Sequence, residues 1–299
     1  MKTARSGAGT TSRPSHDRSE PQFFQLLDQP WGSFSDHEAV HGLEARIVTR
    51  SGDGSGATFM ARLPAGFRRT LKALDATVEW FVLEGDLTLA GRSVRGGGFL
   101  ALPKACGPAR LSSAGGAVVY CFVTPDLRLP TYNAGIHSTN LWQQEWIPAS
   151  LVGMRHGVMS KSVRVPDVRG TQAVGGASGL LRMTLMTPGF AEPRQEVHHN
   201  CWEEVIVLAG DMLFGDRGRL APGSVMSNPP RMWHAPMASQ RGCVFFLHSD
   251  APMDVDYRPW KGGFEACCDH METHSWLDEI QHEAIDAPPH EYLRVGAGD

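Results

Sequence analysis

The sequence has no long apolar stretch and no excess of basic residues. No run approaches the ~20 apolar residues that a membrane-spanning helix needs. Lysine and arginine together number 28 against 32 aspartates and glutamates, which gives a formal net charge of −4. Nucleic-acid binding normally requires a concentrated positive surface. We therefore expect that neither a membrane nor a nucleic acid is a partner of this chain.

Cysteine is also sparse. The six cysteines are scattered through 299 residues, unlike the dense pattern of a small secreted domain held together by disulfides. Residues 1–21 contain basic side chains but no apolar segment behind them, so they do not have the pattern of a secretory signal. Their composition is typical of a disordered tail. We expect a cytoplasmic protein with free thiols and a disordered segment at 1–21.

Glycine and proline are abundant, and the chain repeats itself. The 33 glycines and 20 prolines favour a fold with short strands and tight turns. Three segments recur at offsets of 123 to 125 residues: 64–67 at 187–190, 79–87 at 204–212, and 118–126 at 242–250. Three matches in the same order and at nearly one offset indicate two homologous domains.

Each copy consists of short apolar or β-branched runs that are separated by turns containing glycine. No amphipathic helix lies between these runs, so the pattern predicts an all-β protein with two antiparallel barrels or sandwiches. We place the two copies at 22–135 and 136–255, followed by an extension at 256–299. A short helix is expected at roughly 275–285 of that extension, where apolar residues have helical spacing.

The second copy gathers imidazole and carboxylate side chains. Glu196, His198, His199 and Glu203 lie close together in the sequence, and His234 follows a turn with two prolines. Imidazole nitrogens combined with a carboxylate form a site for a divalent metal ion of the first transition row. Because alternate residues of a strand share a face, Glu196 and His198 are expected to point into the barrel together.

These residues resemble the two sequence motifs of the cupin superfamily. The first motif has a His-x-His pair, a glutamate after three or four intervening residues, and a glycine after six further intervening residues. His198, Glu203 and Gly210 have this spacing, although the first histidine of the pair is absent. The second motif is Pro-x-Gly-x-x-His, which Pro229 to His234 match except for Arg231 at the glycine position.

The resemblance implies a bicupin, which consists of two jelly-roll barrels related by internal duplication, with a few short helices. It also implies one divalent metal ion per chain, held by His198, Glu203 and His234 and completed by either Glu196 or His199. Iron is the first expectation for this ion, with manganese, nickel, copper and zinc as alternatives. Ordinary polar residues at a barrel mouth are the competing interpretation of the histidines.

The first copy lacks the corresponding ligands. Val78 aligns with Glu203, Pro108 aligns with His234, and alanine and leucine lie near the positions of the two histidines. We therefore expect no metal in the first barrel and a stabilising role for it.

Three further groups are weaker candidates. Glu196 is also a candidate for moving protons during catalysis. His248, which ends the last strand of the second copy, would do the same if it lined the pocket. A structural role for His248 is an equal alternative. Arg231 is a candidate either for a local salt bridge or for binding a substrate carboxylate. The group Cys267, Cys268, Asp269, His270 and His274 resembles a zinc cluster, but adjacent cysteines rarely chelate one ion.

Two classes of function follow from the resemblance. The first is an enzyme that acts on a small organic molecule: a mononuclear-metal oxygenase or dioxygenase, or a redox-neutral isomerase, lyase or decarboxylase. The second is a non-catalytic cupin that binds or senses a small molecule, although no helix-turn-helix pattern or basic cluster accompanies it. The resemblance also raises the prospect of a homodimer formed through edge strands.

Overall fold

The computed structural model describes residues 15–34, 38–125, 127, 136–149, 157–164, 178–215, 218–234 and 236–260. These residues form β-strands almost throughout, together with two one-turn 3-10 helices, which confirms the all-β prediction. None of the helices in the described ranges is long and apolar enough to cross a membrane. The helix expected near 275–285 and the cysteine–histidine group at 267–274 lie outside these ranges.

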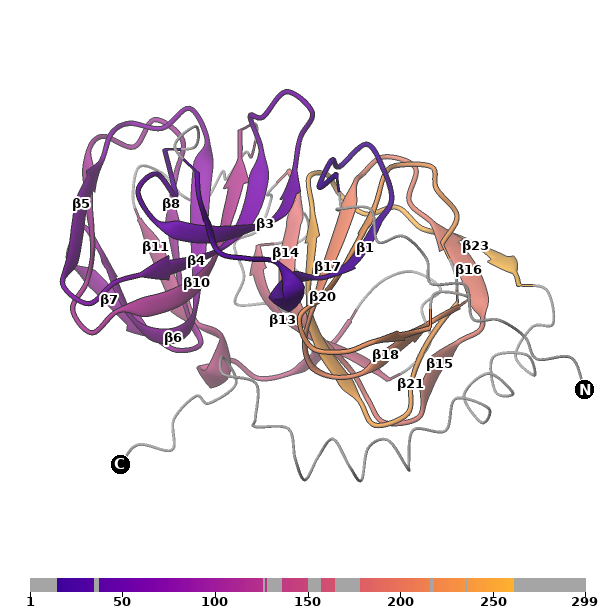
Figure 1. Cartoon of the computed structure of the whole chain (residues 1–299). Coiled ribbons are helices and arrows are strands. Elements are labelled where there is room, and N and C mark those ends of the chain that lie inside the picture. Colours follow the sequence, from indigo (N-terminus) through magenta and orange to yellow (C-terminus); the bar gives the residue numbers. More distant parts are fainter. Residues whose placement is uncertain are drawn as a thin grey trace, which may run out of the picture.

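Two barrels lie side by side, as the prediction of two copies requires (Figure 1). The strands of the first barrel are β2 (Gly32–Ser33), β3 (Glu44–Arg50), β4 (Ala57–Leu63), β5 (Phe67–Leu71), β6 (Thr77–Leu89), β7 (Arg92–Arg95), β8 (Gly98–Leu102), β9 (Ala109–Ser113) and β10 (Ala117–Thr124). The strands of the second are β12 (Ile147–Pro148), β13 (Val158–Arg164), β14 (Leu180–Met186), β15 (Phe190–Glu192), β16 (Arg194–Val197), β17 (Glu203–Gly210), β18 (Met212–Phe214), β19 (Arg219–Leu220), β20 (Ser224–Asn228), β21 (Met237–Ser239), β22 (Cys243–Ser249) and β23 (Asp256–Pro259).

The two barrels exchange strands. β1 (Gln22–Gln25) precedes the first barrel in sequence but pairs with β20 of the second, whereas β11 (His137–Asn140) pairs with β8 of the first. Each exchanged strand leads into a 3-10 helix, η1 (Leu26–Asp28) or η2 (Leu141–Gln143). A two-residue strand then pairs with its own barrel, β2 with β3 and β12 with β13. The division at 135/136 therefore separates the sequence copies but not the sheets.

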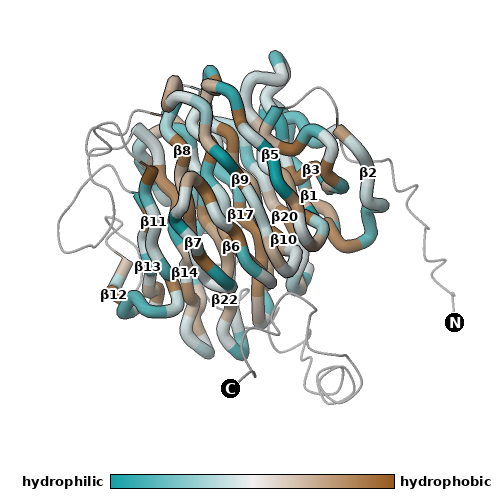
Figure 2. The backbone as a smooth tube through the Cα atoms, turned by 90° about the vertical axis from the view of Figure 1, so that its left-hand side faces the viewer, coloured by the Kyte–Doolittle hydropathy of each residue, from teal (hydrophilic) through white to brown (hydrophobic). Residues whose placement is uncertain are grey.

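Three apolar cores stabilise the molecule. The strands carry alternating apolar residues, so one face of a strand packs inside its barrel and the other packs between the barrels. In β6, for example, Trp80 belongs to the interior core of the first barrel and Phe81 to the core between barrels. Phe81 and Tyr120 of the first barrel meet Phe246 of the second there, with ring centroids 4.7 and 6.0 Å apart. Figure 2 shows the hydrophobic stretches that run along these closely stacked strands.

The duplicated Gly-Asp turns have the same geometry in both barrels. Gly85 has φ +83° and Gly210 has φ +73°. A Cβ atom at either position would lie 1.9 Å from a carbonyl oxygen, that of Gly116 or that of Gly242. Only glycine satisfies both constraints, which explains why the turn recurs in the sequence.

Part of the N-terminal segment is ordered, so the prediction of a disordered tail over 1–21 is wrong for its last residues. Arg18 donates hydrogen bonds to the hydroxyls of Thr49 and Thr58 in the first barrel, at 3.1 and 3.3 Å. Its guanidinium also lies 4.0 Å from the ring centroid of Trp202 in the second barrel. These contacts place Arg18 across the two barrels.

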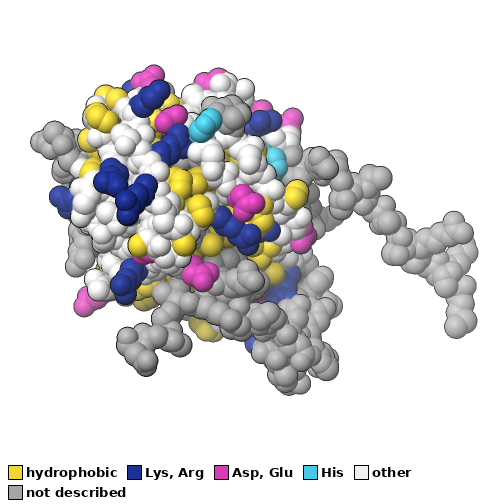
Figure 3. All heavy atoms as spheres, turned by 60° about the vertical axis from the view of Figure 1, so that its left-hand side comes forward, with side chains coloured by type: hydrophobic (Ala, Val, Ile, Leu, Met, Phe, Trp, Pro, Cys, Tyr) yellow, Lys and Arg dark blue, Asp and Glu magenta, His cyan; other side chains and the backbone are white. Residues whose placement is uncertain are grey.

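The face of the molecule in Figure 3 carries Lys and Arg side chains mixed with Asp and Glu. Opposite charges also pair directly at two positions of the first barrel, Arg69 with Glu38 at 2.8 Å and Lys104 with Asp75 at 3.0 Å.

Candidate metal site

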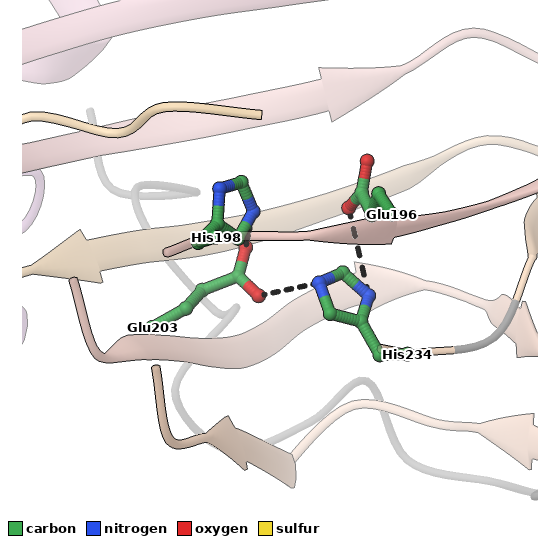
Figure 4. Close-up of side chains that lie close together, drawn as sticks. All are labelled: Glu196, His198, Glu203 and His234. Atoms are coloured by element: carbon green, nitrogen blue, oxygen red, sulfur yellow. Dashed lines mark ion pairs between the residues drawn. The ribbon is translucent and has the colours of Figure 1, made fainter. Parts of the chain in front are cut away.

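Four side chains of the second barrel converge in its interior (Figure 4). Glu196 lies on β16, His198 directly follows that strand, and Glu203 begins β17. His234 comes from the loop after β20 and forms an isolated β-bridge with Glu196. In this bridge the backbone nitrogen of each residue donates to the carbonyl of the other, at 3.3 and 3.0 Å. The bridge holds the second motif against the first.

The four side chains have the spacing of ligands around one ion. One ligand atom from each residue lies within 4.8 Å of all the others. His198 Nε2 is 3.7 Å from Glu203 Oε1, His234 Nε2 is 3.5 Å from Glu203 Oε2, and His234 Nδ1 is 3.6 Å from Glu196 Oε1. These distances are too long for good hydrogen bonds. The Nε2 atoms of both histidines are buried without a hydrogen-bond partner in the described structure.

The ring of His198 is oriented by the segment before β23. Its Nδ1 lies 2.5 Å from the backbone carbonyl of Asp254, so Nδ1 carries the proton and donates it to that oxygen. The Asp254 carboxylate accepts hydrogen bonds from the backbone nitrogens of His199 and Asn200, at 3.0 and 3.2 Å. Such support for the second ring nitrogen is usual for histidines that bind metals. It leaves the Nε2 lone pair of His198 directed at Glu203.

Electrostatics in this cavity favour a cation. Burial and the neighbouring charge of Glu203 raise the pKa of Glu196 well above its ordinary value. Burial lowers the pKa of His234 to about 4, so its ring is neutral at pH 7. One of its two ring nitrogens therefore keeps a free lone pair. Two buried carboxylates without a cation repel each other and lose hydration. A divalent ion would compensate both, so the residues present fit a metal.

The structure distinguishes the two proposed completions of the site. Glu196 lies in the cluster, whereas the side chain of His199 is 43% exposed and pairs with Asp256 at 3.0 Å. Because successive residues of an extended chain point in opposite directions, His198 and His199 cannot both enter the barrel. The cluster therefore contains two histidines and two glutamates, and His199 lies outside it.

Arg231 is also outside the pocket, contrary to expectation. Its side chain is exposed and does not line the cavity. Its backbone has φ +64°, and its backbone nitrogen donates to the carbonyl of His198 at 2.7 Å. The glycine of the second motif is replaced here by an arginine in the left-handed conformation that glycine adopts readily.

His248 faces away from the metal cluster, so the expectation that it lines the pocket is wrong. Its neighbour Leu247 points into the barrel and lines the cavity, and the alternation of β22 turns His248 toward the other barrel. There its Nδ1 lies 3.3 Å from Glu204 Oε1, and its ring packs edge-on against Phe122 and Trp202. Glu204 also accepts hydrogen bonds from the first barrel, at 2.5 Å from Thr49.

Four polar side chains of the pocket were missed by the sequence analysis. Arg182 and Thr184 lie on β14, Glu192 lies on β15 and Tyr257 lies on β23; all four line the cavity beside the cluster. Arg182 Nε and Nη2, the Thr184 hydroxyl and the Tyr257 hydroxyl have no hydrogen-bond partner among the described residues. One signal was available, because Arg182 is the only charged residue in the apolar run 180–186.

The rest of the cavity wall is apolar. It includes five methionines and several branched or aromatic residues: Val158, Met186, Phe190, Val205, Met212, Met226, Met237, Phe245, Leu247 and Met253. The space open to the centres of water molecules is about 30 Å³, enough for an ion with one or two small ligand groups. Methionine side chains adapt easily to a bound molecule.

A second group of possible ligands shares His198 with the first. It consists of His198, Cys201 and Asp254. Burial and three nearby carboxylates raise the pKa of the Cys201 thiol, and a protonated thiol is a poor metal ligand. The Nδ1 atom of His198 is also engaged by the Asp254 carbonyl. The four-residue cluster is therefore the better site.

The corresponding interior of the first barrel is apolar. Val78 stands at the position of Glu203 and is fully buried, together with Trp80, Leu100 and Leu102. These side chains belong to the interior apolar core of the first barrel.

Comparison with known proteins gave structural matches only. No protein-family model matches the sequence, and no curated protein matches it either. A presumed dioxygenase from Nostoc punctiforme has a TM-score of 0.62 at 18% identity, over 81% of this chain and 88% of that one. The bacterial pirin YhhW from Escherichia coli, in complex with nickel(II), has a TM-score of 0.54 at 11% identity, over 78% and 100%.

A mutant of oxalate decarboxylase from Bacillus subtilis is similar over a larger share of the chain. It has a TM-score of 0.50 at 14% identity and covers 93% of this chain and 86% of that one. These proteins share the cupin fold. Sequence identities this low show a common fold and do not show a common activity. The chain therefore has the two-barrel cupin fold.

Proposed function

We propose that the second barrel binds one divalent metal ion and that the chain is a mononuclear-metal oxygenase acting on a small organic molecule. The observation that supports this proposal is the buried cluster of Glu196, His198, Glu203 and His234, in which both Nε2 atoms lack a partner. His198, Glu203 and His234 would hold the ion, because Glu203 lies between the two rings. Glu196 lies at the edge of this group.

Iron(II) is the metal that this donor set fits best. Two histidines and a carboxylate with open coordination positions are typical of non-haem iron oxygenases. When bound, the ion would supply Lewis acidity toward chelating oxygen atoms and redox chemistry toward dioxygen. Manganese, nickel, copper and zinc also accept imidazole and carboxylate ligands, and the pirin structure mentioned above contains nickel(II).

The protein's own groups would orient the substrate and exclude water. Glu196 either serves as the fourth ligand or, when a substrate takes that position, accepts a proton at its carboxylate. The apolar wall, which includes Phe190 and Phe245, keeps the reacting atoms in a dry cavity. The backbone bridge between Glu196 and His234 holds both side chains in place during this exchange.

A redox-neutral lyase or decarboxylase is the second candidate, because the same ligands support Lewis-acid chemistry. The match to oxalate decarboxylase, which also spans both barrels, favours keeping this alternative. A non-catalytic sensor is the third candidate, and it would bind a small molecule without consuming it.

The test begins with the metal content of protein purified without chelators. We expect about one equivalent of metal per chain, and we expect His234→Ala to lose most of it. Val78→Ala in the first barrel is the control and should retain the metal. Oxygen uptake by the iron(II)-loaded protein with a panel of small acids, phenols and diketones then separates an oxygenase from the alternatives. Full metal content in a His198→Ala/His234→Ala double variant would refute the proposed site.

A further inference from the structure

The metal cavity contains a buried guanidinium without a counter-ion of its own. Arg182 is 5% exposed, and no carboxylate among the described residues lies within ion-pair distance of it. Arg164, the other deeply buried arginine of the second barrel, differs in this respect, because its Nε lies 2.9 Å from Glu79 Oε1. Burying an unpaired charge is costly. Glu203 and Glu196 act on Arg182 electrostatically from beyond ion-pair distance, so among the described residues no group pairs with its guanidinium directly.

The charges of the cavity indicate the sign of that partner. When both glutamates are deprotonated, as carboxylate ligands of a metal ion are, Glu196 and Glu203 carry two negative charges and Arg182 one positive charge, while Glu192 is compensated by Arg194 at 2.7 Å. This leaves one net negative charge, which a divalent ion converts into one net positive charge. One carboxylate on a bound ligand would neutralise the cavity. Burial lowers the pKa of Arg182 to about 10, so the guanidinium remains charged at pH 7.

Neighbouring polar groups complete a binding surface for such a ligand. Thr184 is two residues from Arg182 on β14, so both side chains point into the barrel. Within the described part of the chain, neither the buried Thr184 hydroxyl nor the Tyr257 hydroxyl, which also lines the cavity, has a hydrogen-bond partner. Apart from the metal cluster and Glu192, the other wall residues are apolar. A ligand that fits has one charged, oxygen-rich end near β14 and the metal, and an apolar end against the methionines.

We propose that Arg182 binds a carboxylate group of the substrate, so that the substrate is a small organic anion that spans the metal and β14. This inference rests on the proposed metal site. Arginine suits the role because its planar fork donates two parallel hydrogen bonds to a carboxylate. Thr184 donates a third hydrogen bond from the same face. Arg231, a candidate for this role from the sequence alone, is exposed and does not line the cavity.

Ligand binding to the cobalt(II)-loaded protein tests the inference without any assay of activity. The probes are acetate, pyruvate and oxalate, with butane-2,3-dione as the uncharged analogue of pyruvate; the readout is the visible spectrum of cobalt(II). We expect the carboxylates to bind the wild-type protein and pyruvate to bind at least tenfold more tightly than the diketone. Arg182→Gln should weaken carboxylate binding by at least tenfold and leave cobalt stoichiometry unchanged. Arg231→Gln is the matched control and should bind like the wild type.

The outcomes separate this inference from the proposed function. If cobalt does not bind the wild-type protein, or binds His234→Ala equally well, the metal site itself is wrong. If cobalt binds normally but Arg182→Gln retains wild-type affinity for the carboxylates, only the role of Arg182 is wrong. If Arg182→Gln does not fold, the wild-type comparison decides: equal affinity for pyruvate and the diketone, or no binding of any carboxylate, overturns the inference.

Discussion

Two adjacent histidines offer the most direct test of the metal site, because the structure gives them opposite roles. His198 is 4% exposed and its Nε2 faces Glu203. The side chain of His199 is 43% exposed and pairs with Asp256. Replacing each in turn by alanine makes the same chemical change at neighbouring positions. We expect only His198→Ala to affect the metal.

The expected magnitudes differ widely. Changing a group that merely supports a metal ligand lowers affinity by about 10–100-fold, so removing a ligand should cost about 100-fold or more, roughly 2.7 kcal/mol. His199→Ala removes an exposed ion pair worth about 0–1 kcal/mol and should leave metal affinity unchanged. His198→Ala also removes the hydrogen bond to the Asp254 carbonyl, worth about 0.5–1.5 kcal/mol, which is too little to unfold the metal-free protein.

The assay is a competition titration of metal against a coloured chelator, with thermal unfolding of the metal-loaded and metal-free forms. The metal should raise the stability of the wild-type and His199→Ala proteins through mass action. For His198→Ala this increase should fall by about 2.7 kcal/mol at the same free metal concentration. Equal losses of affinity in the two variants would contradict the described geometry. Full retention of metal in both would show that neither imidazole is a ligand.

Two further predictions concern the scaffold. Glu79→Gln and Arg164→Met should each destabilise the protein by about 3–5 kcal/mol, because each leaves one side of a fully buried ion pair uncompensated. Denaturant unfolding should show that the double variant recovers most of this lost stability. Additive losses of stability in the double variant would mean that the pair is hydrated. Gly210→Ala should cost at least about 2 kcal/mol, because the backbone at φ +73° disfavours an L side chain and the added Cβ would meet the carbonyl oxygen of Gly242. A Gly210→Ala protein with wild-type unfolding behaviour would exclude this turn geometry.

The sequence determined the features that depend on local spacing. The repeats predicted two similar barrels, and the glycines at 85 and 210 mark turns that few other residues tolerate. The interval from His198 to Glu203 and the position of His234 after Pro229 identified three members of the cluster. These inferences succeed because the two faces of a strand alternate with a period of two, and a tight turn restricts its residues.

The tertiary structure decided what depends on register and on contacts between distant segments. Either Glu196 or His199 fitted the motif, and only the pairing of β16 with β23 and with His234 turned Glu196 inward and left His199 outside. His248 lies on a strand of the second barrel, but the packing of the two barrels placed it beside Glu204 at their interface.

The strand exchange and the surroundings of the buried guanidinium were likewise decided by the tertiary structure. β1 adds to the second barrel and β11 to the first, although neither lies next to its partner in the chain. In the sequence, Arg182 belongs to a run that has the pattern of an apolar strand. The closed barrel places Arg182 in one cavity wall with Glu196 and Glu203. Local patterns specify which face a residue occupies, whereas the long-range pairing of strands specifies what that face meets.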